Sequence, residues 1–148
     1  MNFDLEIFVD GACRGNPGEA SVGVVVKRNG KIVKEIAEAI GEATNNIAEY
    51  TALIYALKEA IIQKAHNIKI YTDSELMHSQ LTGRYQIKNE KLKPLYTQAN
   101  ELAAHFGVVE IKHVPREENQ EADKLASSVL KKKQAKVVAS TSRFKVSD

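Results

Sequence analysis

Residues 7–18 read IFVDGACRGNPG, and this stretch decides how the rest of the chain can be arranged. Apolar and polar side chains alternate over residues 3–10, which is the period of a half-buried β-strand. The strand is expected to end at Asp10, before the turn residues Asn16-Pro17-Gly18. Glycines in this segment let backbone amides approach a ligand closely. The pattern therefore predicts a strand that carries one carboxylate, Asp10, to a glycine-rich turn.

The composition limits the class of protein. The chain has 148 residues, a net charge of +2 and one cysteine, Cys13. This length suits one domain with its own core. A single cysteine excludes an internal disulfide, and no paired Cys/His spacing indicates a zinc site. The N-terminal apolar run is too short to span a bilayer and lacks the basic start of a signal peptide. We expect a cytoplasmic monomer without a membrane partner.

Charge is unevenly distributed along the chain. Residues 131–148 hold six basic residues and one acidic residue, a net charge of +5, which leaves −3 for residues 1–130. We expect a folded domain over residues 1–133 and a basic C-terminal tail over residues 134–148. Two interpretations of this end of the chain remain open: attraction to nucleic-acid phosphates, or lysines at a helix end followed by an extension.

Hydrophobic periodicity predicts the remaining elements. Residues 20–27 and 31–40 read as strands joined by the hairpin pair Asn29-Gly30. Two further short apolar strands are expected, at residues 67–72 and 108–114. Apolar residues three and four apart predict helices over residues 44–65, 74–81, 90–105 and 117–132. The order βββαβααβα predicts an α/β fold with a five-stranded mixed sheet flanked by helices, in which the first three strands are antiparallel and the last two parallel.

Four acidic residues lie where such a fold can bring them together. Two are expected at strand ends and two in early helical turns: Asp10, Asp73, Glu49 and Asp123. Each alone has an ordinary explanation: an Asx-turn for Asp10 and a helix cap for Asp73. Glu49 could be a capping-box partner, and Asp123 an acid near a helix dipole. Clustered together, they would raise one another's pKa values unless divalent cations neutralised them. Ligands that are all oxygen favour Mg²⁺ or Mn²⁺, and two such ions are the usual apparatus for phosphodiester hydrolysis.

The motifs around these acids resemble ribonuclease H of type 1. They are DGACRGNPG from residue 10, TNNIAEYTAL from residue 44, YTDSELMHSQLTG from residue 71 and HVPREENQEADKLA from residue 113. They follow the family's order and cover about residues 5–130. VPREENQEAD and DSEL are similar to the compact prokaryotic subgroup. The resemblance implies the ribonuclease H fold, with residues 1–133 as the catalytic domain. It also implies hydrolysis of the RNA strand of RNA/DNA hybrids to 5′-phosphate and 3′-hydroxyl ends.

The resemblance also implies roles for individual residues. Asp10 would bridge two Mg²⁺ ions, for which Mn²⁺ is an alternative, and Asp123 would complete the site that activates water. Glu49 and Asp73 would complete the site that stabilises the leaving 3′ oxygen. Contacts to the minor groove and its 2′-hydroxyls are implied for Gly11, Ala12, Cys13, Asn16, Asn45 and Asn46. Thr44 either holds a DNA phosphate or only caps its helix. His113 and Arg116 are candidates for assisting catalysis at product release.

The sequence departs from the family in two places. Glu75 stands where many relatives carry a glutamine, and residues 84–94 are too few for the basic protrusion of the longer form. The expected partner is an RNA/DNA hybrid, with weak binding of double-stranded RNA. Two alternatives are a catalytically inactive nucleic-acid-binding module of the same fold and a nuclease or recombinase that acts on DNA. The four acids favour an enzyme, and the TNN and GNPG segments favour recognition of 2′-hydroxyls.

Overall fold

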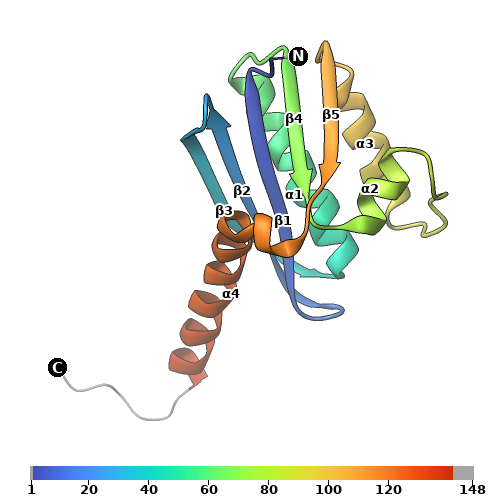
Figure 1. Cartoon of the computed structure of the whole chain (residues 1–148). Helices are drawn as coiled ribbons and strands as arrows, with labels where there is room; N and C mark the ends of the chain where they lie inside the picture. Colours follow the sequence, from blue (N-terminus) through green and yellow to red (C-terminus); the bar gives the residue numbers. More distant parts are fainter. Residues whose placement is uncertain (1, 142–148) are drawn as a thin grey trace.

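A five-stranded mixed sheet lies at the centre of the computed structural model, which describes residues 2–141 and the side chains of residues 2–130. The strand order is β3-β2-β1-β4-β5 (Figure 1). The strands are β1 Leu5–Gly15, β2 Gly18–Arg28, β3 Lys31–Ala43, β4 Asn67–Thr72 and β5 Val108–His113. β1, β2 and β3 are antiparallel neighbours, whereas β4 is parallel to β1 and to β5. The predicted mixed sheet is confirmed.

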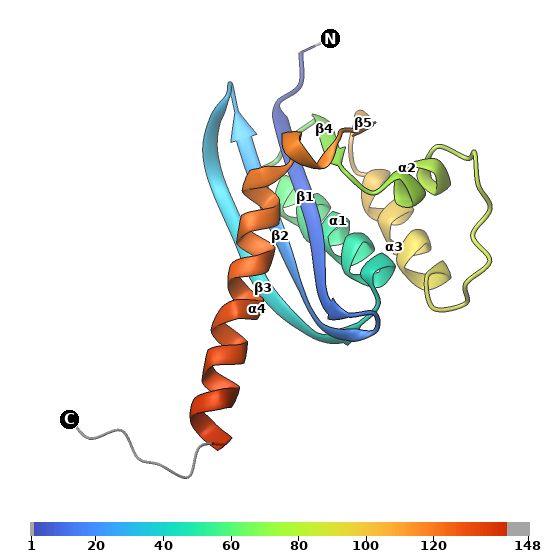
Figure 2. The ribbon, with the colours of Figure 1, turned by 60° about the horizontal axis from the view of Figure 1, so that its bottom comes forward.

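Helices cover the two faces of the sheet unequally. The helices are α1 Asn45–Ile62, α2 Glu75–Leu81, α3 Lys93–Ala103, the 3₁₀ helix η1 Arg116–Glu118 and α4 Gln120–Thr141. Gly11 is pressed against α1 and Gly23, which pairs with Asp10, is pressed against α4. Because neighbouring strand residues point to opposite faces, α1 and α4 lie on opposite faces of the sheet (Figure 2). No helix of the described chain is long and apolar enough to cross a bilayer.

The main hydrophobic core lies between the sheet and α1. Leu5, Ile7 and Val9 of β1 are completely buried, as are Ile68 and Ile70 of β4. α1 contributes its buried face, and α3 packs against α1 on the same side. This core fixes β1 and α1 relative to each other, and both carry predicted site residues.

The expected end of the first strand is wrong. β1 does not stop at Asp10 but continues to Gly15, because its pairing with β2 runs unbroken to the hairpin turn at Asn16-Pro17. The parallel pairing with β4 ends earlier, at Val9 opposite Thr72. Asp10 therefore lies in mid-strand, at the point where β4 leaves the sheet and Asp73 begins the next loop.

The last helix also differs from its predicted range. A break at Asn119 separates η1 from α4, so the helix begins at Gln120. At the other end it continues to Thr141, because residues 131–141 contain neither Gly nor Pro. The lysines at 131–133 lie within α4, so their interpretation as helix-end charges is wrong. The end of the predicted tail, residues 142–148, lies outside the described residues.

Candidate active site

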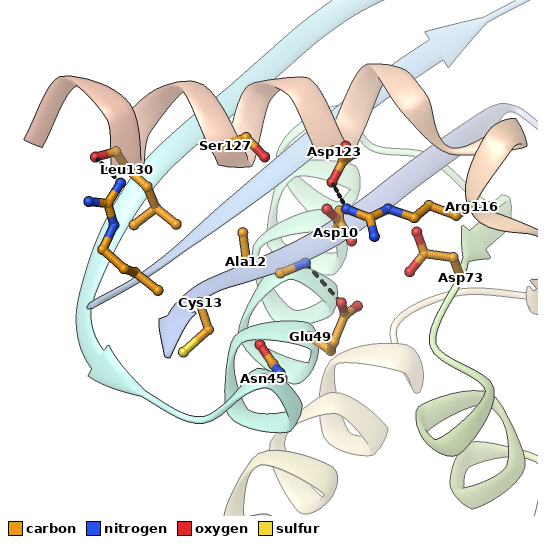
Figure 3. A pocket seen from close by; sticks show the side chains of 12 residues that line it. Asp10, Ala12, Cys13, Asn45, Glu49, Asp73, Arg116, Asp123, Ser127 and Leu130 are labelled. Carbon is orange, nitrogen blue, oxygen red and sulfur yellow. Dashed lines mark hydrogen bonds and ion pairs between the residues drawn. The ribbon is translucent and has the colours of Figure 1, made fainter. Parts of the chain in front are cut away.

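Three carboxylates from three different elements meet beside the middle of β1. Asp10 is on β1, Glu49 is on α1 and Asp73 follows the last residue of β4. Each offers an oxygen within 4.8 Å of the other two, an arrangement that could hold a metal ion (Figure 3). None of the three is a helix cap: Thr44 caps α1 and Ser74 caps α2. The capping explanation of Glu49 and Asp73 is therefore wrong.

Burial makes the negative charges of this group costly. Asp10 is 5% exposed and Glu49 8%. Burial, reinforced by the carboxylates of Glu49, Asp73 and Asp123, raises the pKa of Asp10 to about 9. Burial and the charge of Asp73 likewise raise the pKa of Glu49 to about 8. The site can relieve this repulsion by binding either protons or cations.

The two oxygens of Glu49 have different surroundings. Oε1 accepts a hydrogen bond of 3.2 Å from the backbone N–H of Gly11, which holds the side chain toward β1. Oε2 is buried and has no hydrogen-bond partner among the described residues. Gly11 is required at this contact, because a Cβ there would lie 2.4 Å from the backbone carbon of Ala48. The unpartnered Oε2 fits a cation, since a buried carboxylate oxygen is costly without a partner.

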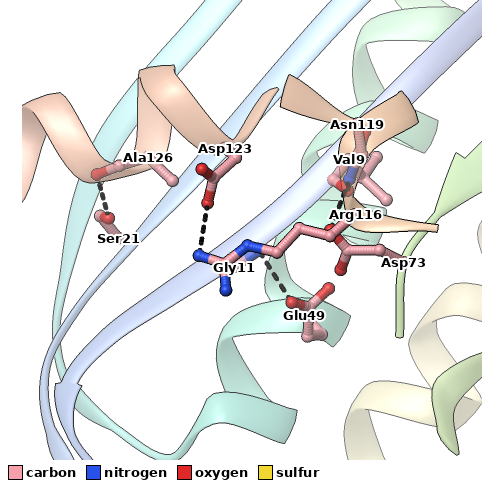
Figure 4. Close-up of polar contacts among 9 residues, drawn as sticks. All are labelled: Val9, Gly11, Ser21, Glu49, Asp73, Arg116, Asn119, Asp123 and Ala126. Carbon is pink, nitrogen blue, oxygen red and sulfur yellow. Dashed lines mark hydrogen bonds and ion pairs between the residues drawn. The ribbon is translucent and has the colours of Figure 1, made fainter. Parts of the chain in front are cut away.

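Asp123 lies in the first turn of α4, at the opposite side of the cleft from α1. Its Oδ1 is 3.5 Å from a guanidinium nitrogen of Arg116 (Figure 4). The side chain of Asp123 is 28% exposed and that of Arg116 is 79% exposed. Asp123 also raises the pKa of Asp10, so it belongs to the same electrostatic cluster.

Asn119 is a site residue that the sequence did not reveal. Its side chain, 1% exposed, donates a hydrogen bond of 2.8 Å to the carbonyl of Val9 and one of 3.3 Å to Oδ2 of Asp73. The amide thus joins β1, the loop after β4 and the start of α4 (Figure 4). In the sequence Asn119 is one polar residue in a charged run, and its only signal is its position four residues before Asp123.

Small residues of β2 set the position of α4. The hydroxyl of Ser21 donates a 2.6 Å hydrogen bond to the carbonyl of Ala126. A Cβ on Gly23 would lie 2.1 Å from the carbonyl oxygen of Ala122. The helix therefore approaches β2 as closely as a glycine permits, and this contact places Asp123 next to Asp10.

A cleft of about 480 Å³ surrounds the carboxylates. All four acids line it, together with five other predicted or implied residues: Gly11, Ala12, Cys13, Asn45 and Arg116. Arg14, Ser127 and Leu130 also line it and were not predicted. The structure thus brings most of the predicted site residues into one cavity.

Four predicted residues lie outside the lining of this cleft. Asn16 is nearby, since its Oδ1 accepts a 2.9 Å hydrogen bond from the N–H of Asn45. Thr44 caps α1 by accepting the N–H of Ile47 at 3.2 Å, and Asn46 is half-buried in the first turn of that helix. His113 is exposed at the end of β5, with its ring centroid 6.1 Å from that of His78.

Comparison with known proteins agrees with this geometry. A family model described as reverse transcriptase-like matches residues 8–129. Ribonuclease HI of Halobacterium salinarum is 45% identical over 127 residues, which are 85% of this chain and 64% of the relative. A crystal structure of RNase H1 from the same archaeon has a TM-score of 0.84 at 43% identity, covering 86% of this chain and 98% of that one. The chain belongs to the ribonuclease H family.

A second solved ribonuclease H is similar over nearly its whole length. LC11-RNase H1, whose crystal structure is a complex with an RNA/DNA hybrid, has a TM-score of 0.84 at 34% identity and covers 88% of this chain and 99% of that one. Two of the curated relatives are longer: the chain spans 64% of the archaeal ribonuclease HI and 35% of the bifunctional protein Rv2228c of Mycobacterium tuberculosis. The ribonuclease H fold predicted from the motifs is confirmed.

Proposed function

We propose that this chain is an endoribonuclease that hydrolyses the RNA strand of RNA/DNA hybrids and leaves 5′-phosphate and 3′-hydroxyl ends. The observation that carries the proposal is the group of Asp10, Glu49 and Asp73, whose oxygens lie within 4.8 Å of one another inside a ribonuclease H fold. Support for the substrate comes from the similar LC11-RNase H1, which was crystallised with a hybrid.

The side chains present fit the binding of divalent cations, of which we propose two. The donors are carboxylate oxygens, which suit Mg²⁺ with Mn²⁺ as an alternative, and the buried Oε2 of Glu49 is unpartnered among the described residues. Asp10 would be shared by both ions, with Asp123 completing one site and Glu49 and Asp73 the other. When bound, such ions activate the attacking water and stabilise the leaving 3′ oxygen.

The protein's own contribution is to hold these ligands in place. The N–H of Gly11 orients Glu49, and the amide of Asn119 orients Asp73 while it anchors the start of α4 to β1. Ligands fixed by such secondary contacts lose little freedom when a cation and a phosphate arrive. Arg116, which lines the same cleft, would bind a phosphate of the substrate.

We assign recognition of the RNA strand to the end of β1, the turn that follows it and the start of α1. Since the N–H of Gly11 is used by Glu49, we assign contacts to 2′-hydroxyls chiefly to Ala12, Cys13 and Asn45, with Asn16 and Asn46 beside them. Backbone groups and amide side chains read the 2′-hydroxyl without reading base identity. Thr44 caps α1, and a DNA-phosphate contact would be a second use of its hydroxyl.

A cleavage assay on three duplexes tests the proposal. With Mg²⁺, we expect a labelled RNA/DNA hybrid to be cut at internal positions, duplex DNA to remain intact and double-stranded RNA to be bound weakly. The fragments should be extended by a polymerase without prior phosphatase treatment, because they end in a 3′-hydroxyl. Hybrid binding without cleavage would instead identify an inactive binding module, and cutting of duplex DNA would identify a DNA nuclease. A monomeric state and a cytoplasmic location remain part of the proposal.

A further inference from the structure

The guanidinium group of Arg116 is a positive charge beside the carboxylate cluster. Its guanidinium is 3.5 Å from Oδ1 of Asp123 (Figure 4). It lines the same cleft as Asp10 and Asp73 (Figure 3). The arginine side chain is 79% exposed. An ion pair exposed to this degree is weak, because water screens both charges. The guanidinium can therefore leave Asp123 without disturbing the fold.

The backbone of Arg116 is held far more firmly than its side chain. Its carbonyl accepts the N–H of Asn119 at 3.0 Å, and the buried side chain of Asn119 is bonded to Val9 on the central strand. The backbone of Arg116 is therefore fixed, while its long, exposed side chain carries a positive charge at the edge of the carboxylate cluster. The reach of the side chain includes both Asp123 and the mouth of the cleft.

We propose that Arg116 is an exchangeable counter-cation, which competes with a divalent cation for Asp123 and transfers to a substrate phosphate when it is displaced. This inference rests on the proposed function, because it requires a divalent cation at Asp123. The guanidinium and the cation are both attracted by the same carboxylate and repel each other. A phosphate is the natural second partner for a displaced guanidinium, whose planar donors match phosphate oxygens.

Two consequences follow from the competition. Arg116 lowers the affinity of the cleft for divalent cations below the value that the carboxylates alone would give. A bound hybrid removes that competition by engaging the guanidinium, so hybrid and cation strengthen each other's binding. Such coupling is reciprocal, because each ligand changes the affinity of the other by the same factor.

Titration of Mg²⁺ alone by isothermal calorimetry tests the competition. With protein first stripped by EDTA and dialysed at low ionic strength, Arg116→Gln should bind Mg²⁺ about two- to fivefold more tightly than the parent, the range that an exposed ion pair allows. Arg116→Lys, which keeps the charge, should stay close to the parent. Arg14→Gln is the matched control, since Arg14 lines the same cleft but its guanidinium lies 3.5 Å from the carbonyl of Leu130. It should change Mg²⁺ affinity less than Arg116→Gln.

A second measurement removes ambiguity about folding. Circular dichroism should show that Arg116→Gln is folded, and in EDTA its Tm should be slightly lower than the parental Tm, because the cluster has lost a counter-charge. Equal Mg²⁺ affinity in the parent and Arg116→Gln would overturn the inference. An equal gain in Arg14→Gln would overturn it too, because the effect would then be one of general charge. Absence of Mg²⁺ binding in the parent would contradict the proposed function itself.

Discussion

The two halves of the carboxylate site are built in different ways. Asp10 and Glu49 are 5% and 8% exposed, and Glu49 and Asp73 are held by hydrogen bonds from Gly11 and Asn119. On the other side of the cleft, the side chain of Asp123 is 28% exposed and is paired with the even more exposed Arg116. One half is part of the packed core, whereas the other depends on the placement of a helix. The difference suggests a fixed ligand set that is completed by an adjustable one.

The packing behind each half explains the contrast. The fixed half is supported by the large core between β1, β4 and α1. The adjustable half is supported by α4, which rests on β2 through contacts with Gly23 and Ser21. A small change in β2 can therefore move Asp123 while Asp10, Glu49 and Asp73 keep their positions.

The largest expected effect is the loss of a ligand from the fixed half. Asp10→Asn or Asp73→Asn should reduce hybrid cleavage by at least about a thousandfold, since the metal site supplies several kcal/mol of transition-state stabilisation. In EDTA both variants should melt at the parental Tm or above it, because one repelling charge is gone. Single-turnover cleavage and calorimetric melting measure the two effects. Near-parental turnover in either variant would remove these residues from the site.

Gly23→Ala tests the adjustable half. The new Cβ would meet the carbonyl of Ala122 at 2.1 Å, so α4 must shift, at a cost of about 1–3 kcal/mol for overpacking. Cleavage should fall even where the variant is fully folded, because Asp123 moves with the helix. Ser21→Ala is the control: it removes the 2.6 Å hydrogen bond to Ala126 without a steric push, and should lower Tm with little loss of cleavage. Equal loss of activity in both variants would mean that helix stability, rather than position, matters.

The pH dependence of stability should be dominated by the fixed half. The pKa of Asp10 is raised from 3.8 to about 9 and that of Glu49 from 4.5 to about 8. The folded state therefore binds protons that the unfolded state has lost. The contribution of these two protonated carboxyl groups to the stability of the fold is fully present below about pH 4, and it is lost as the pH rises through their folded-state pKa values. In EDTA, Tm should fall between pH 5 and pH 9, and Mg²⁺ should restore more stability at pH 9 than at pH 5. Glu49→Gln should flatten the slope, and an unchanged slope would contradict the shifts.

The smallest effect is expected at His113, which lies outside the cleft lining. If its imidazole assists product departure, His113→Ala should lower steady-state turnover more than single-turnover cleavage, because the chemical step rests on the metals. His78→Ala is a useful companion, since the two rings are 6.1 Å apart. Equal losses in both assays would place His113 in the chemical step, and no loss would leave it a structural residue.

Sequence periodicity was sufficient for the element order and the mixed sheet, because each strand and helix carries its own apolar pattern. It also singled out the four carboxylates that line the cleft, although Asp10 lies in mid-strand and not at the expected strand end. Sequence periodicity failed where contacts between distant segments determine where a strand or helix begins or ends. The continuation of β1 to Gly15 depends on pairing with β2, and the helix break at Asn119 depends on a bond to Val9. The functional use of Asn119 and the close approach at Gly23 are likewise visible only once distant segments are in contact.

The central place of β1 in the sheet has a consequence for protein synthesis. β1 emerges from the ribosome before the other four strands, yet its parallel neighbour β4 begins at Asn67. The hydrogen bond from Asn119 to Val9 joins residues 110 positions apart. Contacts so distant in sequence form late, because the intervening chain must exist and then be closed into a loop. A growing chain already contains Asp10, Glu49 and Asp73 while Asp123 is still untranslated. The complete set of acids is therefore available only when synthesis has reached α4.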